Sequence, residues 1–291
     1  MDQQQPKPMQ GKVCLVTGAT GGIGRVTACE LARRGAALII VGRNRERGEI
    51  AMAEARAAGA ASVNFIAADL SNQDQVRRLG QQILDRYPRI DVLVNNAGGM
   101  FRRRILSADG IEMTFALNHL SYYLLTHLLL PALSQAPAAR IVNVASNAHR
   151  GVDIDFSNLQ GEQGYRALRA YKRSKLANIC FTIALARRLE GSGVTANALH
   201  PGFVATDIGA RSDRLAAIAW RLVSLFAIDV EKGAQTSVYL AASKDVAGVS
   251  GQYFSECRPA QPSAPARDRN TQEKLWEVSA AMTGISPAWP R

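Results

Sequence analysis

Two residues that could exchange a proton with a substrate lie one helical turn apart. Tyr171 and Lys175 are four positions apart in a stretch expected to form a helix, so the phenol and the ammonium share one helical face. Close to an oxidised nicotinamide, the lysine would favour the phenolate. A tyrosine with an ordinary pKa of about 10 could then exchange protons nearer pH 7. Because solvated pairs at this spacing are common, the pair indicates hydride transfer only together with a dinucleotide site.

A glycine-rich turn far upstream supplies this second signal. Residues 17–24, Thr-Gly-Ala-Thr-Gly-Gly-Ile-Gly, lie between an expected strand and an expected helix. Glycines at such a place permit a tight turn and let backbone amides approach a pyrophosphate at the amino terminus of the helix. The residues of the turn expected to contact the cofactor are Gly18, Ala19, Thr20, Gly21, Gly22, Ile23 and Gly24.

The end of the second expected strand indicates which nicotinamide cofactor binds. An acidic residue there would hold the ribose 2′-hydroxyl, whereas an arginine accommodates a 2′-phosphate. This chain has Arg43 after Gly42, and Arg25 directly follows the glycine turn. Two guanidinium groups without a carboxylate favour NADP(H), the alternative being that Arg43 only begins a polar loop.

The elements that must position these residues alternate along the chain. Strands are expected at residues 12–16, 37–41, 63–67, 91–94, 140–144, 194–199 and 251–254, and helices at 23–34, 45–58, 73–86, 110–133, around Tyr171 and at 271–282. This alternation predicts an α/β fold, a single doubly wound Rossmann-type domain with a parallel sheet and helices on both faces. We expect a disordered lead-in at residues 1–10, a dinucleotide-binding catalytic domain at 11–291, and a lid-like apolar substrate segment at about 203–230.

Composition excludes several other classes of protein. The 47% hydrophobic and 20% charged residues are typical of a globular core and exclude a disordered chain. The net charge of +11 is carried by scattered arginines with few interleaved aromatics, which disfavours nucleic acid as a partner. The histidines lack metal-ligand spacing, so no metal site is expected. No signal peptide is recognised, and the apolar stretch 215–228 is too short to span a bilayer. We therefore expect a cytoplasmic protein, and peripheral membrane contact through 215–228 stays open.

Taken together, the motifs resemble those of the short-chain dehydrogenase/reductase family over residues 11–282. The motifs that carry this resemblance are Thr17-Gly18, Gly22-Ile23-Gly24, Asp69-Leu70, Asn95-Asn96-Ala97-Gly98, Asn118, Ser146, Tyr171-x-x-x-Lys175 and Pro201-Gly202. The chain is similar to the retinol dehydrogenase branch in Asn118-His119-Leu120, in residues 171–178, 251–257 and 275–279, and in the long gap between Ser146 and Tyr171.

The resemblance implies roles for individual residues. Tyr171 would protonate or deprotonate the substrate oxygen, Lys175 would lower the tyrosine pKa and bind the nicotinamide ribose, and Ser146 would orient the reacting carbonyl. Asn118 would help to hold a water chain that relays the proton. Cofactor contacts are implied for Asp69 and Leu70 at the adenine, for Asn96, Ala97 and Gly98 at the adenosine ribose, for Pro201, Gly202, Val204 and Thr206 on the nicotinamide side, and for Asn118, Tyr171 and Lys175.

The function predicted from these features is hydride transfer between NADP(H) and a lipophilic alcohol, aldehyde or ketone, as in retinol dehydrogenases. The alternatives are a catalytically silent NADP(H)-sensing module of the same fold and a reductase of a non-retinoid carbonyl metabolite. A serine–histidine hydrolase built on Ser146 and His149 is disfavoured, because no Gly-x-Ser-x-Gly elbow surrounds the serine. Apolar faces of the helices near Tyr171 and Gly110 leave open either a homodimer or internal packing.

Overall fold

A computed structural model describes residues 7–202 and 230–288 and contains one eight-stranded sheet in the order β3-β2-β1-β4-β5-β6-β7-β8. The first seven strands pair in parallel and β8 is antiparallel to β7. The strands are β1 Val13–Thr17, β2 Ala37–Gly42, β3 Ser62–Ala67, β4 Val92–Asn95, β5 Arg140–Val144, β6 Thr195–His200, β7 Tyr253–Ser255 and β8 Arg258–Ala260. The predicted single α/β domain with a mostly parallel sheet is thus confirmed.

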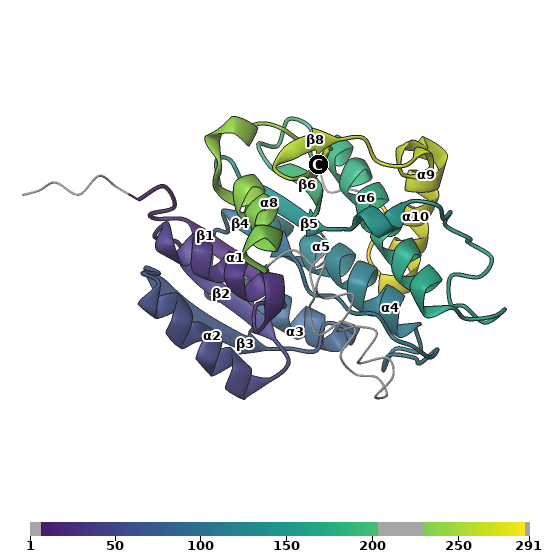
Figure 1. Cartoon of the computed structure of the whole chain (residues 1–291), viewed down its shortest axis with the longest axis horizontal. Coiled ribbons are helices and arrows are strands. Elements are labelled where there is room, and N and C mark those ends of the chain that lie inside the picture. The colour runs from purple at the N-terminus through teal and green to yellow at the C-terminus, as the bar shows by residue number, and fades with distance from the viewer. Residues whose placement is uncertain (1–6, 203–229, 289–291) are drawn as a thin grey trace, which may run out of the picture.

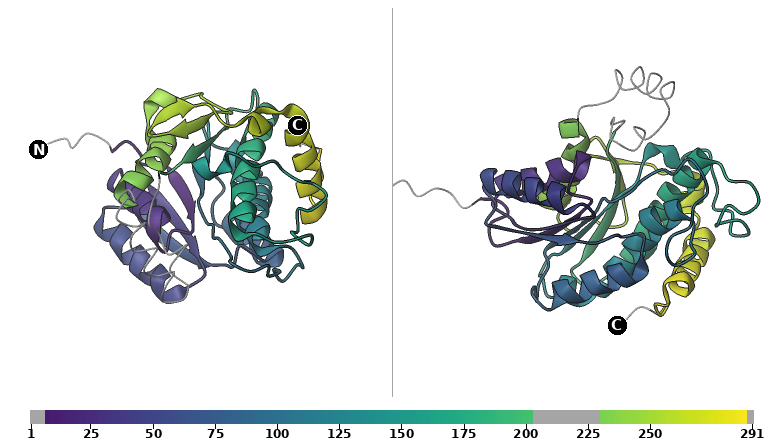
Figure 2. Two further views of the ribbon diagram at one scale, coloured as in Figure 1. Left: turned by 45° about the vertical axis from the view of Figure 1, so that its right-hand side comes forward. Right: turned by 90° about the horizontal axis from the view of Figure 1, so that it is seen from below.

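Helices cover both faces of this sheet (Figures 1 and 2). The longer ones are α1 Gly22–Arg33, α2 Arg45–Ala57, α3 Gln73–Leu84, α5 Ser121–Ser134, α6 Ala167–Arg188, α8 Val230–Ala242 and α10 Arg269–Thr283. Shorter turns of helix are α4 Met113–Phe115, η1 Ala116–Leu120, η2 Asn147–His149, η3 Lys244–Val246 and α9 Ala264–Arg267. None of the helices in the described part of the chain is both long and apolar enough to cross a membrane.

The core lies in two layers because successive strand residues point to opposite faces. Cys14 and Val16 of β1 belong to the layer formed with α1, α2 and α8, whereas Leu15 between them belongs to the layer formed with α3, α5 and α6. All three side chains are completely buried. The centre of the sheet is therefore covered on both sides, as a parallel sheet requires.

The strand order reverses at β1, which lies between β2 and β4. The chain builds β1, β2 and β3 in one direction and then crosses over to add β4 to β7 in the other. The carboxyl ends of β1 and β4 consequently diverge into loops on opposite sides, which is the place where doubly wound folds bind ligands. The glycine turn follows β1 at this point.

The carboxyl-terminal part of the chain completes the sheet and then packs outside it. A two-residue turn joins β7 to β8, and its residues Glu256 and Cys257 both have positive φ, at 51° and 59°. The helix α10 then lies against α6 (Figure 2). Its Trp276 is buried and stacks on Phe181 of α6 with ring centroids 5.9 Å apart. The apolar face of α6 is therefore packed internally over this stretch.

The structure differs from the expected elements in three places, and a fourth expectation falls outside it. The helix expected at residues 110–133 is broken into α4, the π-helical turn η1 and α5. The disordered lead-in is wrong for residues 7–10, which form a turn in which the apolar Met9 is buried and donates its N–H to the Arg34 carbonyl at 2.9 Å. The helix α8 was not expected. The proposed lid, except for Val230, lies outside the described residues.

Candidate active site

Hydrogen bonds from Asn96, directly after β4, stabilise the glycine turn after β1. The Asn96 amide nitrogen donates to the Thr17 carbonyl at 2.8 Å and to the Gly18 carbonyl at 3.4 Å. The Thr17 hydroxyl accepts from the backbone N–H groups of Asn96 and Ala97 at 2.9 and 3.1 Å. The side chain of Asn96, expected to contact the adenosine ribose, is thus engaged in shaping the turn.

The turn leaves no room for a side chain at Gly18 or Gly24. Gly18 has φ +65°, and a Cβ there would lie 2.8 Å from the Ala97 Cα. A Cβ on Gly24 would lie 2.5 Å from the Gly18 carbonyl oxygen. A Cβ on Gly21, by contrast, would meet no atom within 4 Å, so the space above this residue is open. The α1 amino terminus beside it has no acidic residue in its first turn, which suits an anion at this helix end.

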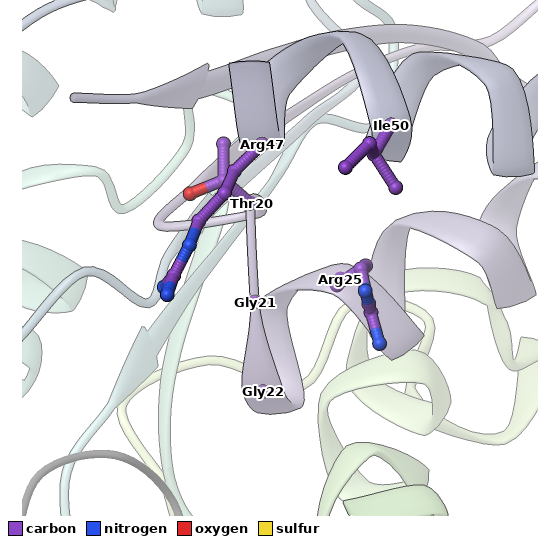
Figure 3. A pocket seen from close by; sticks show the side chains of 6 residues that line it. All are labelled: Thr20, Gly21, Gly22, Arg25, Arg47 and Ile50. Carbon is purple, nitrogen blue, oxygen red and sulfur yellow. The ribbon is translucent and has the colours of Figure 1, made fainter. Parts of the chain in front are cut away.

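A cavity of about 340 Å³ opens beside the glycine turn (Figure 3). It is lined by Thr20, Gly21, Gly22, Arg25, Arg47 and Ile50. Arg25 of α1 and Arg47 of α2 approach it from two helices, and Arg25 lies 3.5 Å from the Glu54 carboxylate. Arg43 is exposed directly after β2. Arg47 was missed in the sequence, because an arginine on the outer face of a helix usually only contacts solvent.

The π-helical turn η1 presents Asn118 to two other elements. Its Oδ1 accepts from the Gly99 N–H at 2.8 Å, and its Nδ2 donates to the Gly99 carbonyl and to the Ser174 hydroxyl, both at 2.9 Å. The Ser174 hydroxyl in turn donates to the Tyr171 carbonyl at 2.7 Å. Single π-turns within helices are frequent at functional sites. Asn118 therefore links the loop after β4 to the α6 helix that carries Tyr171 and Lys175.

Tyr171 and Lys175 lie on one face of α6, as their spacing predicts. The Lys175 ammonium is 5.7 Å from the centroid of the Tyr171 ring and donates to the Val144 carbonyl at 2.9 Å. Burial lowers the pKa of Lys175 to about 8. Burial raises the pKa of Tyr171, while a hydrogen bond with the Ser146 side chain acts to lower it. A Cβ on Gly98 would lie 3.5 Å from the Lys175 ammonium, so the glycine keeps the space beside the lysine open.

Ser146 follows β5 and begins the turn η2. Its hydroxyl accepts from the Ala148 N–H at 3.1 Å. Both ring nitrogens of the nearby His149 are engaged elsewhere: Nδ1 bonds the Ser146 carbonyl at 2.7 Å, and Nε2 accepts from the Ser263 N–H at 3.0 Å. The imidazole is therefore not arranged as a base for the serine hydroxyl, which agrees with the absence of a hydrolase motif.

The remaining candidate residues are distributed around the same edge of the sheet. Asp69 accepts from the N–H and hydroxyl of Ser71 at 3.0 and 2.8 Å, and Leu70 is buried. Pro201 and Gly202 follow β6 and are half-buried. Val204 and Thr206 lie outside the described residues.

Comparison with known proteins gives concordant matches. Residues 12–215 match the family model described as short chain dehydrogenase. The chain is 44% identical over 276 residues to mouse retinol dehydrogenase 12, covering 94% of this chain and 87% of that protein. It is 43% identical to human retinol dehydrogenase 14, covering 96% and 88%.

Solved structures show the same likeness. An uncharacterized protein from Mycobacterium paratuberculosis matches with a TM-score of 0.78 and 34% identity, over 97% of this chain and 96% of that one. The Pseudomonas aeruginosa RhlG/NADP active-site complex matches with a TM-score of 0.69 and 28% identity, over 87% and 97%.

Proposed function

The chain belongs to the short chain dehydrogenase family, in its retinol dehydrogenase branch, and on this premise we propose that it transfers a hydride between NADP(H) and a lipophilic alcohol, aldehyde or ketone. The family makes it an oxidoreductase of alcohol and carbonyl groups. The names of its relatives, which are retinol dehydrogenases, support an apolar substrate. The choice of NADP(H) is supported by the arginines around the glycine turn.

The observation that carries this proposal is the convergence of four side chains from three elements. Tyr171 lies beside Lys175, the Ser146 side chain acts to lower the pKa of Tyr171, and Asn118 reaches the same helix through Ser174. We propose that Tyr171 gives or takes the proton at the substrate oxygen and that Ser146 hydrogen-bonds this oxygen. The Lys175 ammonium would favour the phenolate and hold the nicotinamide ribose. Because both ends of the Asn118 amide are bonded within the protein, its side chain holds the loop and α6 in place, and a water relay through it stays a prediction.

The residues around the glycine turn fit a dinucleotide with a 2′-phosphate. The open space above Gly21 and the amino terminus of α1 would hold the pyrophosphate. Arg25, Arg43 and Arg47 would surround the 2′-phosphate, where guanidinium groups form charge-assisted hydrogen bonds. When bound, the nicotinamide supplies or accepts the hydride.

Initial rates with NADPH and NADH, measured on aldehydes and ketones of increasing apolar size, test this function. We expect NADPH to be preferred by about tenfold or more, since one charge-assisted contact contributes roughly 1.5–3 kcal/mol. We also expect the Michaelis constant to fall as the hydrocarbon part of the substrate lengthens. Equal efficiency with both cofactors would refute the NADP(H) assignment, and a preference for small charged substrates would refute the apolar one.

Two tyrosine variants test the catalytic assignment. Tyr171→Phe should lower kcat by about 10²–10⁴ while leaving NADPH binding nearly unchanged. Tyr123→Phe is the matched control, because the Tyr123 hydroxyl is buried in the aromatic cluster of α5 without a hydrogen-bond partner in the described structure. A Tyr171→Phe enzyme with most of its activity would mean that another group moves the proton.

A further inference from the structure

The turn that carries Ser146 is held by the carboxyl-terminal part of the chain. The Asn147 Oδ1 accepts from the Tyr253 hydroxyl of β7 at 2.9 Å. The Arg150 guanidinium donates to the Gln261 carbonyl, just beyond β8, at 2.6 Å. Segments that are more than 100 residues apart in sequence are thus joined on both sides of His149.

His149 forms the central connection and has a single arrangement of its protons. The Ser146 carbonyl, 2.7 Å from Nδ1, can only accept, so Nδ1 carries the proton. The Ser263 N–H, 3.0 Å from Nε2, can only donate, so Nε2 is unprotonated. The ring is buried and meets the Tyr253 ring edge-on, with centroids 5.2 Å apart. Burial lowers the pKa of His149, which agrees with a neutral imidazole.

These bonds fix the backbone of Ser146 as well as its side chain. The Ser146 carbonyl receives the His149 backbone N–H at 3.1 Å in addition to the ring Nδ1. The Ser146 hydroxyl receives the Ala148 N–H and acts to lower the pKa of Tyr171. A change in the His149 ring would therefore be transmitted directly to the peptide group of the serine.

We propose that His149 is a positioning residue that orients Ser146, and that the Ser263 amide holds this imidazole in place. The carboxyl-terminal segment after β8 thereby sets the geometry of the substrate-binding serine, although no hydrogen bond joins it to Ser146 or Tyr171 in the described residues. The inference rests on the proposed function for its kinetic consequence only, because the bonds themselves can be observed without turnover.

Two substitutions at residue 263 distinguish the role of its backbone N–H from that of its side chain. Ser263 has φ −60°, which proline can adopt, so Ser263→Pro removes the N–H that bonds His149 and places the ring Cδ against the imidazole in its stead. Ser263→Ala keeps this N–H and removes only the hydroxyl, whose oxygen has no hydrogen-bond partner in the described structure. We expect Ser263→Pro to lower kcat by about tenfold, since small displacements at a reacting centre have effects of this size, and Ser263→Ala to match the wild type.

Two substitutions of His149 form the second part of the experiment. His149→Phe fills a similar volume but can neither donate nor accept, whereas His149→Gln can do both. Phenylalanine should lower kcat at least as much as Ser263→Pro does, and glutamine should restore most of it. The Kd of NADPH should stay within twofold in all four variants, because the phosphates bind at the glycine turn, away from this bridge. A purely structural role would instead lower the thermal midpoint and weaken NADPH binding together.

His127→Phe is the control for removing a half-buried imidazole, since its Nδ1 also bonds a backbone carbonyl, that of Tyr123, at 2.7 Å. It should leave kcat unchanged. Amide hydrogen exchange gives a readout independent of turnover: the amides of residues 146–150 and 263 should exchange faster in His149→Phe than in His149→Gln. Wild-type kcat in both Ser263→Pro and His149→Phe would overturn the inference, as would equal protection in the two His149 variants. Absence of NADPH-linked turnover in the wild type, with the exchange difference present, would instead refute the proposed function.

Discussion

Adding one methyl group to Gly24 should damage the cofactor site through the backbone of the glycine turn. The new Cβ would lie 2.4 Å from the Asn96 amide nitrogen and 2.5 Å from the Gly18 carbonyl oxygen. Both distances are about 1 Å shorter than a normal van der Waals contact. Neither atom can easily move away, because the Asn96 amide is hydrogen-bonded to the Thr17 carbonyl and the Gly18 oxygen belongs to the backbone. The turn must therefore move by about 1 Å.

The expected magnitudes follow from this displacement. Overpacking costs roughly 1–3 kcal/mol, and alanine regains about 1 kcal/mol of helix propensity in α1. The net loss of stability is therefore about 0–2 kcal/mol, or up to about 4 °C in thermal midpoint. The cofactor should lose at least one backbone bond to its pyrophosphate. Since a hydrogen bond to a charged group contributes roughly 1.5–3 kcal/mol, the Kd of NADPH should rise by about 10-fold to 150-fold.

Gly21→Ala provides the comparison within the same turn. Its Cβ meets no atom of the protein within 4 Å, and its φ of −175° suits any residue, so the thermal midpoint should not fall. The residue lines the cavity, however, and the methyl group should still weaken NADPH binding. Differential scanning fluorimetry and fluorescence titration with NADPH measure both quantities. The reasoning fails if Gly24→Ala binds NADPH within twofold of the wild type, or if Gly21→Ala is the less stable of the two.

Three further results are expected. Arg43→Asp should reduce the ratio of kcat/KM for NADPH over NADH by about tenfold or more; an unchanged ratio would assign the 2′-phosphate to Arg25 and Arg47. Ser174→Ala should lower kcat by about 5-fold to 150-fold in steady-state assays, because the buried amide of Asn118 loses its acceptor, and full activity would show that this bond is dispensable. Burial lowers the pKa of His119 to about 4 from an unfolded value of 6.5, so the unfolded chain binds the proton first and stability falls as pH drops from 6.5 toward 4. Between pH 7.5 and 5 His119 alone should contribute a loss on the order of 2 kcal/mol by urea unfolding. Because burial also lowers the pKa of His127 and His200, the total loss is larger, and in His119→Gln it should shrink by about this amount.

Local signals in the sequence were sufficient to predict most strands and helices. They were also sufficient to predict the glycine turn and the shared helical face of Tyr171 and Lys175. Glycine turns and runs of β-branched residues depend on contacts within a few residues, so the pattern around Gly18 predicts the structure found there. The spacing of Tyr171 and Lys175 likewise depends only on helical geometry. The roles of these residues remain predictions that the experiments above address.

What the sequence did not reveal depends on contacts between distant segments. Residues 116–120 are all buried, so their hydrophobic pattern defines no face and gives no sign of the π-helical turn at Asn118. The helix α8 is rich in small residues and packs closely on α1, a property that periodicity alone does not show. The position of Arg47 beside the cavity and the bond between His149 and Ser263 require the fold itself.

The outer edge of β8 bears on whether the protein aggregates at high protein concentration. Ser255 and Arg258 flank the two-residue turn, and in such a hairpin this pair is the hydrogen-bonded one. In the next pair, Phe254 and Pro259, the backbone N–H and C=O positions therefore point away from the partner strand. The outward-facing position of β8 is therefore a proline, which has no N–H to donate. A strand from another molecule would find no donor at the centre of this three-residue edge. The tight turn at Glu256 and Cys257 thus fixes the pairing that turns Pro259 outward. The proline protects this end of the sheet against intermolecular strand pairing and aggregation.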